Sequence, residues 1–256
     1  MTAIDVHAVV SGRDDAPAVV LSNSLGSTHR MWDAQLDALE DRFRVVRYDT
    51  RGHGDSPAPD GPYSIDDLTD DVVALLDRLG IERAHVIGLS LGGMTAMRLA
   101  VRNPDRVDRI ALLCTGAQLP PASAWSERAA LVRADGSAAV AAAVVERWFT
   151  PGYLAAHPGV RIELEHMVAA TSSEGYAGCC EAIAELDLRE QLSSITAPTL
   201  AIAGADDPAT PPVRLEEIAA RIPDSKLLVV QRAAHLANAE QPGIITPALI
   251  AHLESS

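Results

Sequence analysis

Short apolar runs rich in β-branched residues alternate along the chain with longer stretches whose apolar positions recur at helical spacing. Runs of the first kind are typical of buried strands, and the longer stretches are typical of amphipathic helices. The expected strands are 4–10, 18–23, 43–49, 84–89, 109–114, 199–204 and 226–231, and the expected helices are about 64–79, 91–102, 212–221 and 241–253. The alternation predicts an α/β fold, with a mostly parallel sheet covered by helices on both faces.

The pattern changes between residues 120 and 182, where helical stretches follow one another without a convincing strand. The segment leaves the strand at 109–114 and the chain returns to the sheet at 199–204, so we expect it to cover the carboxyl edge of the sheet. The sequence therefore predicts a core domain formed by residues 1–119 and 183–256, with a helical cap (lid) insertion at 120–182.

Composition and charge narrow the class of protein. The chain has 256 residues, of which 48% are hydrophobic and 22% charged, and these values are ordinary for a globular enzyme. The formal net charge of -14 argues against nucleic acid as a partner, because binding a phosphate backbone requires clustered Lys and Arg.

The first residues, the longest apolar run and the cysteines indicate the cellular location and the redox state of the thiols. The first residues, "MTAIDVHAVVSGRDD", lack the basic and apolar regions of a signal peptide, and the longest apolar run, 138–145, is too short to span a bilayer. We therefore expect a cytoplasmic protein with no membrane partner. Cys114, Cys179 and Cys180 are odd in number and two are adjacent, so we expect them to be reduced and buried.

The strand at 84–89 ends in "GLSLG", residues 88–92, which fits the pattern G-x-S-x-G. Small flanking residues allow a strained strand-to-helix turn that lifts Ser90 above the sheet as a nucleophile. In the alternative interpretation Ser90 only caps the helix that begins at Leu91.

A serine nucleophile requires a histidine base and a carboxylate that orients it. His235 alone among the histidines lies just past the last strand and before the last helix. The strand at 109–114 is followed by no carboxylate, whereas "GADDPATPP" after strand 199–204 offers Asp206 and Asp207. We select Asp207, which otherwise would be a turn-forming residue before Pro208, and the order Ser90, Asp207, His235 is that of α/β hydrolases.

Charge that develops on a carbonyl oxygen requires backbone N–H donors. Leu91 follows the nucleophile, and Leu25 in "SNSLGS" lies after an earlier strand, so we expect their N–H groups to form an oxyanion hole. Asn23 and Ser24 are candidates for holding that loop, although ordinary turn chemistry explains them equally well. The loop "YDTRGHGDS", 48–56, matches no phosphate-binding motif, and we expect His53 to brace it. No metal-binding motif is present, so we expect no metal.

The segments "SNSLGSTHRMWDAQ", "YDTRGHGDSPAPDGPYSIDDL", "GLSLGGM", "ERWFTP", "EGYAGCCEAI" and "IAGADDPATPP" together resemble the 3-oxoadipate enol-lactonases of aromatic catabolism. The resemblance implies hydrolysis of the enol-lactone to 3-oxoadipate without a cofactor, with Ser90, Asp207 and His235 as the triad. It also implies that Trp125 and Trp148 form walls of the substrate pocket, where packing within the cap is the alternative explanation.

An anionic enol-lactone requires local cations in a protein of net charge -14. The cap offers Arg128, Arg133, Arg147 and Arg161, of which Arg128 and Arg147, beside the two tryptophans, are the candidates for binding the substrate carboxylate.

Competing functions are another cap-bearing serine hydrolase, such as an esterase, a carbon–carbon bond hydrolase or a haloperoxidase-like enzyme, and a non-catalytic binding protein on a hydrolase scaffold. The residues do not indicate the oligomeric state, or whether the lactone derives from protocatechuate or catechol.

Overall fold

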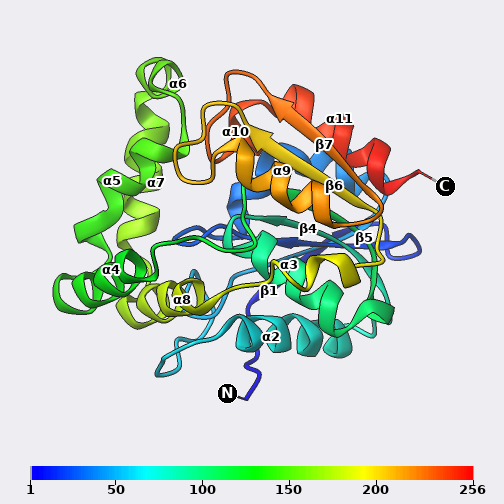
Figure 1. Cartoon of the computed structure of the whole chain (residues 1–256), viewed down its shortest axis with the longest axis horizontal. Coiled ribbons are helices and arrows are strands. Elements are labelled where there is room, and N and C mark those ends of the chain that lie inside the picture. The colour runs from blue at the N-terminus through cyan, green and yellow to red at the C-terminus, as the bar shows by residue number, and fades with distance from the viewer. Residues whose placement is uncertain (1, 256) are drawn as a thin grey trace.

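A seven-stranded sheet with the order β1-β3-β2-β4-β5-β6-β7 forms the centre of the computed structural model, which describes residues 2–255 (Figure 1). β1 pairs with β3 antiparallel and all other neighbours are parallel, so the predicted fold class is confirmed. The strands are β1 (Ala8–Gly12), β2 (Ala18–Ser22), β3 (Arg44–Tyr48), β4 (Ala84–Leu89), β5 (Val107–Leu113), β6 (Thr199–Gly204) and β7 (Ser225–Val230).

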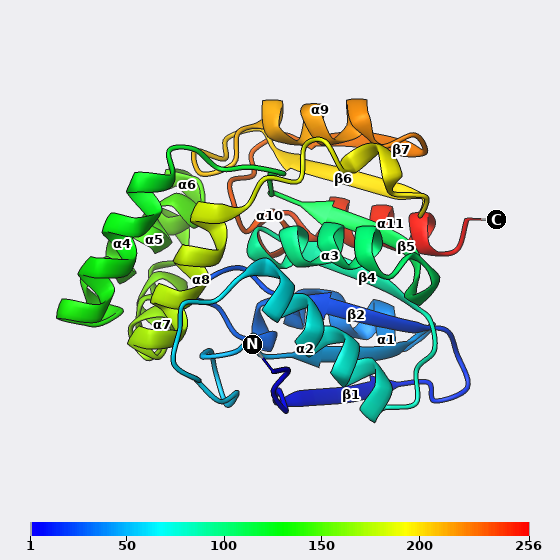
Figure 2. The same cartoon turned by 60° about the horizontal axis from the view of Figure 1, so that its bottom comes forward.

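Helices cover both faces of this sheet (Figure 2). α2 and α3 lie together on one face, α1 and α11 lie on the other, and α9 packs against β6 and β7. Outside the region 120–185, the helices are η1 (His29–Gln35), α1 (Leu36–Glu40), α2 (Ile65–Arg78), α3 (Leu91–Arg102), η2 (Pro104–Arg106), η3 (Leu192–Ser194), α9 (Pro212–Arg221), α10 (Ala237–Glu240) and α11 (Pro242–Leu253).

Local sequence signals at both ends of α2 explain where this helix begins and ends. Ser64 and Asp67 form a reciprocal capping box, in which each side chain accepts a hydrogen bond from the backbone N–H of the other residue. Gly80, just past the last turn, has φ +66°, a backbone conformation that residues other than glycine rarely adopt.

The first strand was expected at 4–10 but spans Ala8–Gly12, so its predicted position was wrong by several residues. In the preceding segment, backbone N–H groups donate to side chains instead of to a neighbouring strand. The N–H of Ile4 donates to the Asp71 carboxylate, and that of His7 donates to the Ser56 hydroxyl. The apolar pattern of this segment could not reveal these polar contacts.

Five helices lie together beyond the carboxyl ends of the parallel strands (Figure 2). α4 packs along α8, and α5 packs along α7. They are α4 (Ala122–Asp135), α5 (Ala138–Trp148), α6 (Pro151–Ala156), α7 (Pro158–Ala169) and α8 (Ser173–Glu185). The helical character expected of 120–182 is therefore observed, and the division into core and cap domains remains a prediction.

Two glycines of helix α8 lie very close to residues that follow β3. A Cβ atom added to Gly175 would lie 2.3 Å from the Cα of Gly52, in the loop after β3, and one added to Gly178 would lie 2.6 Å from the ring of Tyr63. Next to this contact, the buried Arg51 pairs with the buried Asp71 at 2.6 Å. The absence of side chains on both glycines therefore sets how closely α8 approaches the sheet.

Two further expectations concern thiols and membranes. Cys114, Cys179 and Cys180 are free and buried, as the sequence predicts. Within residues 2–255, no helix combines the length and the apolar composition needed to cross a bilayer.

We predict that Gly175→Ala lowers the free energy of unfolding by about 1–3 kcal/mol, because the added methyl group forces the two backbones apart. Gly159→Ala is the matched control: it lies in the first turn of α7, where an added Cβ meets nothing within 4 Å. The control should be neutral or stabilising by up to about 1 kcal/mol, since alanine favours helices. Urea unfolding measures both; equal effects would contradict the tight contact.

Candidate active site

Ser90 lies at the sharp turn between β4 and α3 with φ 58° and ψ −117°. A Cβ atom on Gly88 would lie 2.2 Å from the carbonyl oxygen of Gly92, and one on Gly92 would lie 2.1 Å from that of Ser22. The turn therefore requires glycine at both flanking positions. Among the described residues, the Ser90 side chain makes no capping hydrogen bond to α3, so the alternative role as a helix cap finds no support.

His235 and Asp207 form a buried hydrogen-bonded pair. Nδ1 of His235 donates to Oδ2 of Asp207 at 2.8 Å. Oδ1 of Asp207 accepts the N–H groups of Ala209 and Thr210, and Oδ2 also accepts the Thr210 hydroxyl at 2.6 Å. Asp206, the other carboxylate weighed from the sequence, is exposed.

The surroundings of Asp207 favour its ionised form. Burial alone would raise the pKa of the carboxyl group, but the charge and hydrogen bond of His235 and the hydrogen bonds from Thr210 lower the pKa below its usual value. An ionised Asp207 holds the proton of His235 on Nδ1, which leaves Nε2 available as a base.

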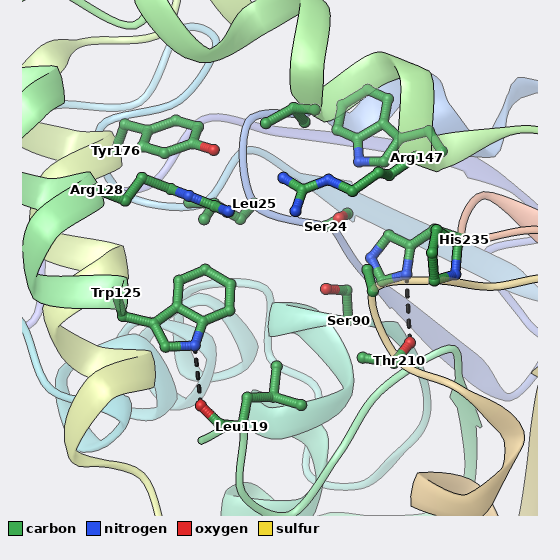
Figure 3. A pocket seen from close by; sticks show the side chains of 14 residues that line it. Ser24, Leu25, Ser90, Leu119, Trp125, Arg128, Arg147, Tyr176, Thr210 and His235 are labelled. Atoms are coloured by element: carbon green, nitrogen blue, oxygen red, sulfur yellow. Dashed lines mark hydrogen bonds between the residues drawn. The ribbon is translucent and has the colours of Figure 1, made fainter. Parts of the chain in front are cut away.

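Ser90 and His235 line one cavity of about 150 Å³, to which both the sheet edge and the helices α4, α5 and α8 contribute side chains. Figure 3 shows the Ser90 hydroxyl beside the His235 ring and the Ser24 hydroxyl. Within the described chain, no hydrogen bond joins Ser90 Oγ to His235, and catalytic contacts of this kind often tighten only when substrate binds.

Within residues 2–255, some backbone N–H groups near Ser90 have a hydrogen-bond acceptor and others do not. In the turn between β4 and α3, the N–H group of Ser90 donates to the carbonyl oxygen of Leu113, and that of Gly92 donates to the carbonyl oxygen of Asn23. In the loop after β2, the N–H groups of Ser24, Gly26 and Ser27 all donate to acceptors. Among residues 2–255, the N–H groups of Leu25 and Leu91 find no such acceptor, and both residues were selected from the sequence.

His53 braces the loop that carries Leu25. Its Nε2 accepts the N–H of Gly26 at 3.0 Å, and its Nδ1 donates to the carbonyl oxygen of Arg51 at 3.0 Å. Burial lowers the pKa of His53, which favours the neutral ring that this arrangement requires. Asn23 also braces the loop, through Tyr48 and Trp32, whereas Ser24 lines the cavity instead.

The structure separates the four arginines of the cap into two pairs. Arg133 pairs with Glu174 and Glu181, and Arg161 pairs with Glu165. Arg128 and Arg147 line the cavity, and in the described part of the chain neither forms an ion pair. Burial, with the nearby charge of Arg128, lowers the pKa of Arg147.

Both tryptophans expected in the pocket line it. The guanidinium of Arg128 lies 4.7 Å from the centroid of the Trp125 ring, and the indole N–H of Trp125 donates to the carbonyl oxygen of Leu119. Tyr176 and Thr210 also line the cavity and were not selected from the sequence. Thr210 stands three residues after Asp207 in "DDPAT", a spacing at which short polar side chains often bond.

Comparison with known proteins places this geometry in a family. The model of the alpha/beta hydrolase fold matches residues 17–135 and 162–242. The chain belongs to the alpha/beta hydrolase family. Within it, the chain is 44% identical over 244 residues to 3-oxoadipate enol-lactonase 2 of Acinetobacter baylyi, with 94% of this chain and 91% of that protein covered. The resemblance to the 3-oxoadipate enol-lactonases is thereby confirmed.

Solved structures of this hydrolase family agree closely with the fold. The enol-lactonase from Burkholderia xenovorans LB400 is 42% identical, with a TM-score of 0.95 and coverage of 98% of this chain and 96% of that chain. A thermophilic esterase from Thermogutta terrifontis is 29% identical, with a TM-score of 0.92 and coverage of 98% and 93%.

We predict that the stabilising contribution of Asp207 disappears in acid. The pKa of the Asp207 carboxyl group is lowered in the folded state. Its contribution to stability is therefore fully present above the pKa that an aspartate has in the unfolded chain, about 3.9, and is lost as the pH falls through its pKa in the folded protein. Wild type should be more stable than Asp207→Asn at pH 6, and the difference should shrink toward pH 2. Asp206→Asn is the exposed control and should show no such trend in urea unfolding.

Proposed function

We propose that the chain hydrolyses 3-oxoadipate enol-lactone to 3-oxoadipate, with Ser90 as nucleophile, His235 as base and Asp207 as the acid that orients it. The observation that carries the proposal is the gathering of Ser90, the hydrogen-bonded His235 and two arginines without ion-pair partners around one cavity. The similarity to two enol-lactonases over nearly the whole chain supports the choice of substrate.

Acylation begins when Oγ of Ser90 attacks the lactone carbonyl carbon and Nε2 of His235 takes the hydroxyl proton. The N–H groups of Leu25 and Leu91 donate to the oxyanion that forms. The bond between the carbonyl carbon and the ring oxygen then breaks, the ring oxygen leaves as an enol that receives the proton from His235, and the enol tautomerises to the 3-oxo group.

Deacylation repeats the proton transfer with water. His235 takes a proton from a water molecule, the hydroxide attacks the acyl carbon, and Ser90 recovers its proton as the ester bond breaks. Asp207 stays ionised throughout and stabilises the imidazolium that forms in each half of the reaction. The product carries two carboxylates, one of them newly formed from the lactone.

Arg128 and Arg147 are proposed to bind the carboxylate that the substrate already carries. A charge-assisted hydrogen bond to a guanidinium compensates for the repulsion expected from a net charge of -14. Trp125, whose ring contacts Arg128, and Trp148 would form the apolar walls around the ring of the lactone.

The other expectations stand with this proposal as predictions. The division into a core (1–119 and 183–256) and a cap (120–182), the cytoplasmic location and the absence of nucleic-acid partners are of this kind. The similarity to the Thermogutta terrifontis esterase favours the esterase alternative. Arg128 and Arg147, which line the cavity and form no ion pair within residues 2–255, favour an anionic substrate over a neutral ester.

Ser90→Ala should abolish both hydrolysis of the enol-lactone and labelling by a fluorophosphonate, with an unchanged melting temperature, because only one hydroxyl is lost. Loss of enol-lactone absorbance measures the reaction. Ser24→Ala removes another hydroxyl of the same cavity and should still be labelled. Undiminished labelling or turnover of Ser90→Ala would refute the mechanism.

The substrate itself is tested on the wild type. Its kcat/KM for the enol-lactone should exceed that for p-nitrophenyl acetate by about 100-fold or more, because only the lactone offers a carboxylate to the arginines of the cavity. Equal values would support the esterase alternative. Absence of both labelling and hydrolysis would support a binding protein.

Truncation of the arginines should separate anionic from neutral substrates. In at least one of Arg128→Ala and Arg147→Ala, KM for the enol-lactone should rise more than tenfold, a loss of about 1.4 kcal/mol or more of binding free energy, with hydrolysis of a neutral ester nearly unchanged. Arg133→Ala and Arg161→Ala are matched controls, since their charges are neutralised within the cap. If no variant distinguishes the two substrates, the carboxylate is bound elsewhere.

A further inference from the structure

His7, His29 and Asp49 form a cluster of side chains that does not line the cavity of Ser90. Nδ1 of His7 lies 3.0 Å from Oδ2 of Asp49, and Nδ1 of His29 lies 3.1 Å from Oδ1. One nitrogen of each ring and one oxygen of the carboxylate all lie within 4.8 Å of one another. Within residues 2–255, no other group of three His, Cys, Asp or Glu side chains gathers its ligand atoms so closely.

Backbone contacts hold the three residues in place. His7 immediately precedes β1 and stands opposite Asp49 in the antiparallel pairing with β3, where the N–H of Asp49 donates to the carbonyl oxygen of His7 at 3.0 Å. Opposed residues of such a pair present their side chains on the same face. His29 begins η1, and its own N–H donates to Oδ1 of Asp49 at 2.8 Å. The cluster is thus built by the ends of three separate segments.

We propose that His7, His29 and Asp49 bind one divalent transition-metal ion of the zinc type. Imidazole nitrogen and carboxylate oxygen bind zinc at about 2.0–2.2 Å, so two such ligands on one ion lie about 3 Å apart or slightly more. Nδ1 of His7 lies at about this distance from Oδ2 of Asp49, and Nδ1 of His29 lies at about this distance from Oδ1, so the carboxylate would face the ion with both oxygens. Calcium and magnesium select sites made of oxygen atoms and fit a set with two imidazoles poorly.

Binding requires a rearrangement of protons but not of the backbone. Each imidazole now donates its Nδ1 proton to Asp49; with a metal present, the proton resides on Nε2 and Nδ1 binds the ion. The N–H groups of His29 and Asp55 still donate to the carboxylate and hold it in place.

Access and charge also suit a cation. The side chains of His7 and His29 are 34% and 17% exposed, so the ion and a water ligand reach the cluster from solvent, whereas Asp49 is 1% exposed. In the described part of the chain, Asp49 forms ion pairs with these two imidazoles and with no Lys or Arg. The negative net charge attracts cations in addition.

The test is a calorimetric titration of the full chain with zinc chloride at pH 7.5, in a buffer that does not bind zinc, with calcium chloride as the control ion. His7→Gln and His29→Gln preserve a side-chain N–H donor for Asp49 but remove the imidazole ligand. His166→Gln is the matched control, since it replaces an exposed histidine of α7 outside the cluster.

Wild type and His166→Gln should bind one zinc ion per chain, and each cluster variant should bind it at least about tenfold more weakly. Zinc should raise the melting temperature of the first two proteins and not of the cluster variants, because the ion binds the folded chain. Calcium should not bind. Absence of saturable zinc binding to wild type, or binding that survives both cluster substitutions, would overturn the proposal.

Discussion

The close approach of the β4–α3 turn to the end of β2 is the constraint on which the candidate site depends. The N–H of Gly92 donates to the carbonyl oxygen of Asn23 at 2.9 Å, and no side chain fits between the two backbones. The loop that carries Leu25 is thereby fixed relative to Ser90. One steric requirement thus brings the proposed nucleophile and both proposed oxyanion donors together, before any cap residue takes part.

A second set of contacts extends this arrangement toward the cap. His53 binds the N–H of Gly26 on one side and the Arg51 carbonyl on the other, and the neighbouring Gly52 contacts Gly175 of α8. The loop after β3 therefore connects the loop that carries Leu25 to the helix that brings Tyr176 to the cavity. A displacement of α8 would reach the N–H of Leu25 through this loop, because packed backbones transmit small shifts.

The sequence predicts those parts of the site where the local geometry allows only a few residue types. It does not predict contacts between residues that only folding brings together. Gly88, Ser90 and Gly92 stand in the sequence as a motif because the turn admits few alternatives. The chain order of nucleophile, acid and base admits Asp206 as well as Asp207, and the burial of Asp207 and the exposure of Asp206 distinguish the two only in three dimensions. Residues 4–7 looked like a strand, but their backbone bonds to side chains from distant segments.

The ion pairs of the cap arginines are a second example of contacts that the sequence does not predict. The sequence singles out Arg128 and Arg147 because each lies near a tryptophan, but it does not show which of the four arginines find carboxylate partners after folding. The fold pairs Arg133 with two glutamates at the rim and leaves Arg128 and Arg147 facing the cavity. Two like charges held near each other are costly, and burial with the charge of Arg128 lowers the pKa of Arg147. An anion bound between them would relieve that repulsion, so the charge distribution itself favours a substrate that carries a carboxylate.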